Sequence, residues 1–230
     1  MLGSFSSKFT YGRSKAVVVA TSNASLAFGS GGATWVSTTD NAPVNDGWTL
    51  VNNYSVDDSS LSVNMPFMFY IYGSGSQGLY VGSNTYLTLG SGSSQYSSLS
   101  LGPTPAPTIA GIHLGSADNS YQRVWYKSVS STVFKVRYEG NGSTSGTLGN
   151  PGIVYEVTFY KSNGTYQYVQ ISLGKHNKLG GVFGITSGVI SGNYLSFANA
   201  GITPAQYENY VIRTDTTGNN PTIYSGVYTP

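Results

Sequence analysis

Two glutamates have the residue type and spacing closest to a catalytic arrangement. Glu139 and Glu156 fall on the same face of two adjacent predicted strands, and a glycan hydrolase needs two carboxylates facing each other across a cleft. The same face carries Lys135 and Arg137, and a hairpin centred near residues 145–147 places Glu156 opposite one of these two cations. Cross-strand ion pairing is the ordinary result of such a register. We therefore expect paired charges, no catalytic residues and a protein that is not an enzyme.

The remaining catalytic and metal-binding patterns are weaker. The chain has two histidines, His113 and His176, and Asp118 follows His113 closely. A Ser/His/Asp triad would need a nucleophile turn between a strand and a helix, and the sequence around these residues lacks one. Asp57 and Asp58, and the run at residues 118–120, offer oxygen ligands that suit calcium. Solvated acids and an Asx-turn explain these runs better, so we predict neither a metal site nor a cofactor.

Composition excludes several classes of protein. The 230 residues contain no cysteine, which excludes a disulfide scaffold, a thiolate zinc site and a cysteine nucleophile. Charged residues make up 9% of the chain, against about 25% in ordinary domains. The net charge of +2 gives no basis for binding nucleic acid. The apolar run at residues 16–20 is too short for a signal peptide or a membrane span, so we expect no signal peptide and synthesis in a cytoplasm.

Aromatic side chains are the better candidates for binding. The chain contains 19 tyrosines, and many of its aromatic residues crowd the stretch from residue 70 to residue 126. Exposed Tyr and Trp rings stack on sugars or pack against another subunit. Alternation predicts that about half of them lie in the core, without saying which half. The candidate ligand-binding shelf consists of Tyr80, Tyr86, Tyr96, Tyr121, Trp125 and Tyr126.

Period-two alternation of apolar residues predicts an all-β fold. The clearest strands are expected at residues 133–139, 153–160 and 166–173, and they should form a meander. Many short strands separated by polar turns indicate a β-sandwich, jelly-roll-like, in a single domain.

The two ends of the chain differ from its middle. Residues 46–197 hold the predicted sandwich core. Residues 1–45 and 198–230 are rich in Ser, Thr, Asn and Gly with sparse apolar anchors. We interpret these segments as extended N- and C-terminal arms that order on a neighbouring subunit. Within the first arm, residues 16–20 and 25–29 are expected to pair as a hairpin.

Several motifs in the middle of the chain resemble those of a known group of proteins. Residues 82–90 (GSNTYLTLG), with Ser-Ser-x-Tyr-Ser at 93–97, resemble a "GSNsYlTFG…SSxYS" motif. Residues 117–126 (ADNSYQRVWY) and the later VRYEG and VYEVTF segments follow in the same order. This order resembles virion proteins of phages and large algal viruses, among them tail-fibre-like and minor capsid components, over roughly residues 60–185.

The resemblance implies a non-enzymatic viral structural protein located in the virion, as a capsid-associated, vertex-fibre or tail-fibre component. Its partners would be itself or other virion proteins, held through β edges and arms. More distantly, residues 65–90 resemble the "PFxFxFYG…VxVSSNGYLTFG" pattern of adhesive extracellular β modules. That likeness implies an alternative, a receptor- or glycan-binding adhesin whose partner is a host-surface glycan. Neither pattern carries catalytic residues, and a glycan hydrolase is the third hypothesis.

Overall fold

The computed structural model is an all-β protein, which confirms the predicted fold class. Every regular element among the described residues is a strand, and no helix able to span a membrane is found among them. The described residues are 18–19, 47–53, 59–93, 111–114, 122–140, 153–161, 164, 166–176, 183–187, 194–205, 208–216 and 221–228.

The larger sheet has seven antiparallel strands, and the predicted meander forms its centre. Val136 pairs with Val157, and Val157 pairs with Ile171. Side chains of successive strands therefore align in rows on each face of the sheet. In spatial order the strands are β14 (Thr222–Ser225), β13 (Asn209–Asp215), β10 (Tyr166–His176), β9 (Ile153–Tyr160), β8 (Val133–Gly140), β7 (Gln122–Ser130) and β2 (Thr49–Asn53).

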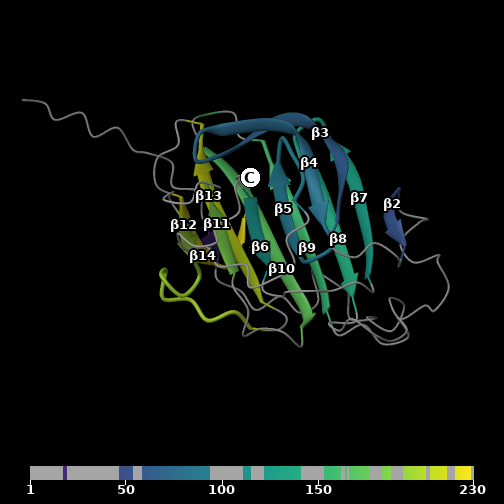
Figure 1. Cartoon of the computed structure of the whole chain (residues 1–230). Coiled ribbons are helices and arrows are strands. Elements are labelled where there is room, and N and C mark those ends of the chain that lie inside the picture. Colours follow the sequence, from purple (N-terminus) through teal and green to yellow (C-terminus); the bar gives the residue numbers. More distant parts are fainter. Residues whose placement is uncertain are drawn as a thin grey trace, which may run out of the picture.

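The smaller sheet has six antiparallel strands and is layered over one face of the larger sheet (Figure 1). Its order is β12 (Tyr194–Ser196), β11 (Phe183–Thr186), β6 (Gly111–Leu114), β5 (Tyr86–Leu89), β4 (Ser74–Gly82) and β3 (Ser60–Ile71). A two-residue turn at Tyr72 and Gly73 joins β3 to β4, and both residues have positive φ, 47° and 80°. This is the geometry of a type I′ turn, whose twist matches that of the flanking strands.

The hydrophobic core lies between the two sheets, so the fold is a β-sandwich. Along β3, alternate residues from Val63 to Ile71 are buried, while the residues between them are exposed or half-buried. Phe69 of this strand meets Phe159 of β9 edge-to-face, with ring centroids 5.1 Å apart. Such contacts join the two inner faces. The jelly-roll character stays a prediction.

Polar contacts also join the sheets, at the edge strand β3. The Gln167 side chain from β10 donates to the Met68 carbonyl (2.9 Å) and accepts from the Tyr70 amide (2.8 Å). The Thr214 hydroxyl from β13 donates to the Tyr70 carbonyl (2.8 Å). These two side chains therefore satisfy backbone groups of β3 that point away from β4. We call Gln167 and Thr214 the edge cap.

The C-terminal boundary of the predicted core is wrong. Residues 198–230 were expected to form an extended arm, but β13 and β14 belong to the seven-stranded sheet. Tyr210 and Ile212 of β13 lie in the hydrophobic core. β13 pairs with β10 along seven residue pairs. Its core-facing positions are apolar except for Thr214, whose hydroxyl bonds the smaller sheet. The low overall apolar content of this segment hides that short alternation.

Two residues of the expected N-terminal hairpin form a strand. β1 (Val18–Val19) forms a two-stranded antiparallel sheet with β15 (Val227–Tyr228), near the other end of the chain. The second half of the expected hairpin, residues 25–29, lies outside the described residues.

Candidate functional site

A row of polar side chains crosses the outer face of the seven-stranded sheet, away from the core. Arg137, Glu156, Ser172 and Asn209 occupy equivalent register positions on β8, β9, β10 and β13. We call these four residues the polar ladder. Each is no more than 7% exposed. Charged residues are rarely buried to this degree unless they are paired, so their partners decide what the ladder can do.

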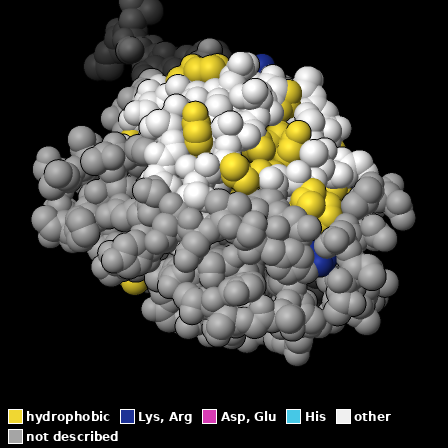
Figure 2. All heavy atoms as spheres, turned by 45° about the vertical axis from the view of Figure 1, so that its right-hand side comes forward, with side chains coloured by type: hydrophobic (Ala, Val, Ile, Leu, Met, Phe, Trp, Pro, Cys, Tyr) yellow, Lys and Arg dark blue, Asp and Glu magenta, His cyan; other side chains and the backbone are white. Residues whose placement is uncertain are grey.

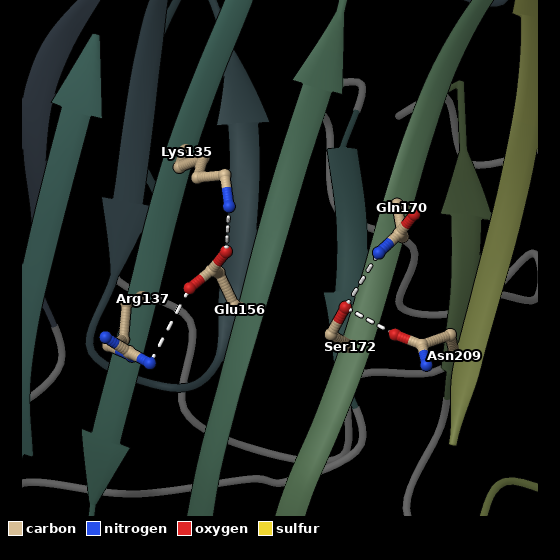
Figure 3. A network of polar contacts seen from close by, with 6 residues as sticks. All are labelled: Lys135, Arg137, Glu156, Gln170, Ser172 and Asn209. Carbon is tan, nitrogen blue, oxygen red and sulfur yellow. Dashed lines mark hydrogen bonds and ion pairs between the residues drawn. The ribbon is translucent and has the colours of Figure 1, made fainter. Parts of the chain in front are cut away.

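Glu156 is the acceptor for two cations on β8 (Figure 3). Its Oε1 lies 2.6 Å from Nζ of Lys135, and its Oε2 lies 3.6 Å from a terminal nitrogen of Arg137. The Trp48 ring adds a cation–π contact, with the Arg137 guanidinium carbon 5.2 Å from its centroid. The register also confirms the expected cross-strand pairing, since Arg137 is directly opposite Glu156.

The other half of the ladder is neutral. The Ser172 hydroxyl donates to Oδ1 of Asn209 (2.6 Å) and accepts from Nε2 of Gln170 (3.0 Å). Gln170 in turn accepts the backbone amide of Tyr228 through its Oε1 (3.1 Å). A chain of amides and hydroxyls therefore links the ladder to β15. Such a chain fixes the positions of its side chains.

Glu139 is the one carboxyl of this face with a strongly shifted pKa. It stands opposite Arg123 on β7 and Val154 on β9, and it is 2% exposed. Burial raises the pKa of Glu139 from 4.5 to about 7, and the charges of Arg137 and Arg123 oppose this only in part. Its Oε1 has no hydrogen-bond partner among the described residues.

The two glutamates do not meet the requirement of a glycan hydrolase. The sequence hypothesis needed two unpaired carboxylates in a cleft, and Glu156 is committed to Lys135 and Arg137. Glu139 is buried within the sheet face. Within the described residues, no group of three or more His, Cys, Asp or Glu side chains gathers to hold a metal ion. The geometry therefore favours a structural role for this charged cluster.

The predicted aromatic shelf is divided between the two sheets. Tyr80 is half-buried on β4, and its register partners are Ser62 and Thr88. Trp125 is 1% exposed on β7, between Leu50 and Arg137. Tyr126 points to the core side and stacks on Phe134, with centroids 5.8 Å apart. Tyr96 and Tyr121 lie outside the described residues. The four described positions, Tyr80, Tyr86, Trp125 and Tyr126, do not form one exposed surface.

Tyr86 is buried for a local reason. A Cβ added to Gly82 would come within 2.5 Å of the Tyr86 ring, so the ring packs directly on the bare glycine backbone. The Tyr86 hydroxyl donates to the Ser93 carbonyl. The side chain is 1% exposed, and its ring is not available for stacking on a sugar. The GSNTY motif that contains both residues therefore has a packing role in this fold.

The two histidines lie on different sheets. His113 is on β6, where it pairs with Tyr86 and Gly184, and His176 ends β10 opposite Ile153. Asp118, Asp57 and Asp58 lie outside the described residues.

Sequence reasoning missed an aromatic seat at the C-terminus. The Tyr228 ring stacks on Tyr168, with centroids 4.1 Å apart, and lies 4.8 Å from the Tyr160 ring. Together with Gln170, these rings form what we call the Tyr228 seat. Tyr160 and Tyr168 are register partners on β9 and β10, and that pairing follows from the predicted hairpin. Nothing in the sequence signalled that Tyr228 would return to them.

The visible described surface is dominated by uncharged polar groups (Figure 2). Hydrophobic side chains lie among them in separate patches, and few charged side chains are seen on this face. The most exposed large hydrophobic residues are Val129 (48%), Met68 (41%) and Tyr194 (39%). Comparison of the chain with family models, with curated proteins and with solved structures finds no match.

Proposed function

We propose that this chain is a non-enzymatic structural component of a virion, assembled from copies of itself or with other virion proteins. The observation that carries the proposal is the arrangement of strand edges. Among the described strands, β14 and β2 end one large sheet, and β12 and β3 end the other. Edge strands present unpaired backbone groups that pair readily with another chain. The exception is the end of β3, where Gln167 and Thr214 already bond the outward groups at Met68 and Tyr70. The resemblance of residues 60–185 to virion proteins supports a virion as the assembly to which the chain belongs.

The composition of the surface supports the same proposal. A chain with 9% charged residues has few of the charges that normally keep edge strands apart. The buried charges on β8 and β9 are paired internally, and the aromatic rings of the Tyr228 seat are used inside the molecule. The charged cluster and the Tyr228 seat therefore stabilise the fold, and among the described residues the strand edges are available for contact.

The test is the mass of the full chain in solution, measured by light scattering over a range of concentrations. We expect a discrete oligomer. Ser225 is exposed at the end of β14, and Ser225→Lys should weaken assembly because a lysine on an edge strand hinders strand pairing. Ser131→Lys is the matched control, since Ser131 is exposed in the turn between β7 and β8. A monomer at all concentrations contradicts assembly from copies of this chain.

A glycan-binding adhesin is the second candidate, and the observation that favours it is Tyr80. This ring is half-buried rather than packed away in the core, and a partly exposed tyrosine is suited to stack on a sugar. A chain that stays monomeric and binds on a glycan array favours the adhesin over the structural component.

A further inference from the structure

The two ends of the chain meet in a very short strand pair. β1 contributes Val18 and Val19, whose partners in β15 are Tyr228 and Val227. Among the described strands, β1 forms a ladder with β15 alone and with neither large sheet. Its pairing with the rest of the protein therefore rests on two residue pairs, and the ladders of the sandwich are complete without it.

β15 is held by side chains of the seven-stranded sheet. The Tyr228 seat provides two ring contacts from β9 and β10, and Gln170 accepts the Tyr228 amide. These contacts come from the centre of the seven-stranded sheet. β15 is thus positioned by its own domain and offers the strand edge to which β1 adds. The same edge suits any copy of β1, because strand addition uses backbone groups.

The sequence separation allows β1 to reach another molecule. Residues 20–48 separate Val19 from Thr49, the start of β2. A chain of that length spans up to roughly 100 Å when extended. A 230-residue domain has a radius of gyration of about 17 Å. The connection is therefore long enough to carry β1 onto a neighbouring copy.

We propose that, in the assembled protein, β1 of one copy pairs with β15 of a neighbouring copy. The exchanged contact has the same residue pairs as the contact within one chain, so exchange costs no pairing and links the two copies. High local concentration in an assembly favours the exchanged form, whereas dilution favours the closed one. This proposal rests on the proposed structural function and identifies the contact that joins neighbouring subunits.

A chain without cysteine permits a direct test by disulfide trapping. Val19→Cys and Val227→Cys place thiols at paired positions. The two single variants, one carrying a size tag, are mixed before assembly and then oxidised. We expect a covalent tagged–untagged dimer that disappears on reduction. The matched control replaces Val19→Cys by Val129→Cys, since Val129 is exposed on β7. Thermal unfolding of each variant checks that the sandwich is intact.

The outcomes separate this inference from the proposed function. A mixed-copy disulfide in excess of the Val129→Cys control supports strand exchange. The double variant carries both Val19→Cys and Val227→Cys in one chain. If the protein assembles and the double variant forms its disulfide within single chains, while the mixed single variants stay unlinked, the inference is overturned. The structural function then stands. If the chain is monomeric throughout and only the double variant closes, both the inference and assembly from copies of this chain are overturned.

Discussion

At the scale of single residues, the shifted carboxyl of Glu139 is the feature with the clearest solution consequence. Its pKa is raised from 4.5 to about 7 by burial, so the folded protein holds this proton more tightly than the unfolded chain. Its contribution to stability is fully present below pH 4.5 and is lost as the pH rises through about 7. The polar ladder beside it keeps Arg137 occupied with Glu156, which limits the compensation available to Glu139.

We expect Glu139→Gln to flatten the dependence of stability on pH. A shift of this size corresponds to about 3 kcal/mol of unfolding free energy. The parent should lose most of that amount relative to the variant between pH 4.5 and pH 8, measured by urea unfolding at several pH values. Glu156→Gln is the contrasting variant, because it removes the negative charge that faces Lys135 and Arg137 and should destabilise at neutral pH. Parallel pH curves for the parent and Glu139→Gln would show that Glu139 is not the titrating group.

Residue patterns alone predicted the charged half of the polar ladder. The alternation of residues 133–139 and 153–160 places Lys135, Arg137 and Glu156 on one face, and the structure confirms their pairing. The aromatic shelf could not be resolved in the same way. Which face of a strand is buried depends on neighbours distant in sequence, and Tyr86 is buried because Gly82 leaves room beneath its ring.

At the scale of elements, β3 depends on side chains from the opposite sheet. β3 is an edge strand, so its outward backbone groups at Met68 and Tyr70 have no neighbouring strand to pair with. The edge cap of Gln167 and Thr214 satisfies three of them. A buried or half-buried backbone group that loses its partner costs more than the bond itself contributed.

We expect Gln167→Ala to destabilise the protein by roughly 2–4 kcal/mol, because two backbone groups of β3 lose their partners. Gln77→Ala is the matched control, since Gln77 is exposed on β4 and should change stability little. Urea unfolding of the two variants and the parent measures the difference. Equal effects of the two substitutions would contradict the capping role.

Element prediction succeeded for long alternating strands and failed for strands with mixed chemistry. The meander of β8, β9 and β10 has consecutive apolar positions at period two, and the sequence shows it directly. β13 has Tyr210, Ile212 and Thr214 on its inner side, and Thr214 is there to bond β3. A search for alternating apolar residues misses such a strand, because one of its core-facing residues is polar. That residue is polar because it bonds a partner in the other sheet.

At the scale of the whole molecule, the sandwich includes strands of the C-terminal segment, whereas β1 pairs with β15. β13 contributes Tyr210 and Ile212 to the core and pairs with β10 over seven positions. β1 forms a ladder with β15 only, among the described strands. The two ends of the chain should therefore respond differently to deletion.

We expect a chain that starts at Ala20 to keep cooperative thermal unfolding, and a chain that ends at Phe197 to lose it. The second deletion removes β13, β14 and β15. It exposes the edge of β10 that pairs with β13, together with apolar core surface. Circular dichroism and calorimetry measure both variants. Cooperative unfolding of the chain that ends at Phe197 would contradict the assignment of β13 to the core sheet.

The edge cap also has a consequence for synthesis on the ribosome. Gln167 lies 97 and 99 residues from its two partners in β3, and Thr214 lies 144 residues from Tyr70. At ordinary translation rates these side chains emerge roughly 5 to 30 s after β3. During that interval the nascent chain carries β3 without its cap. Neighbouring ribosomes on one messenger would then hold such strands close together, and chaperone contact is most useful to this protein during that interval.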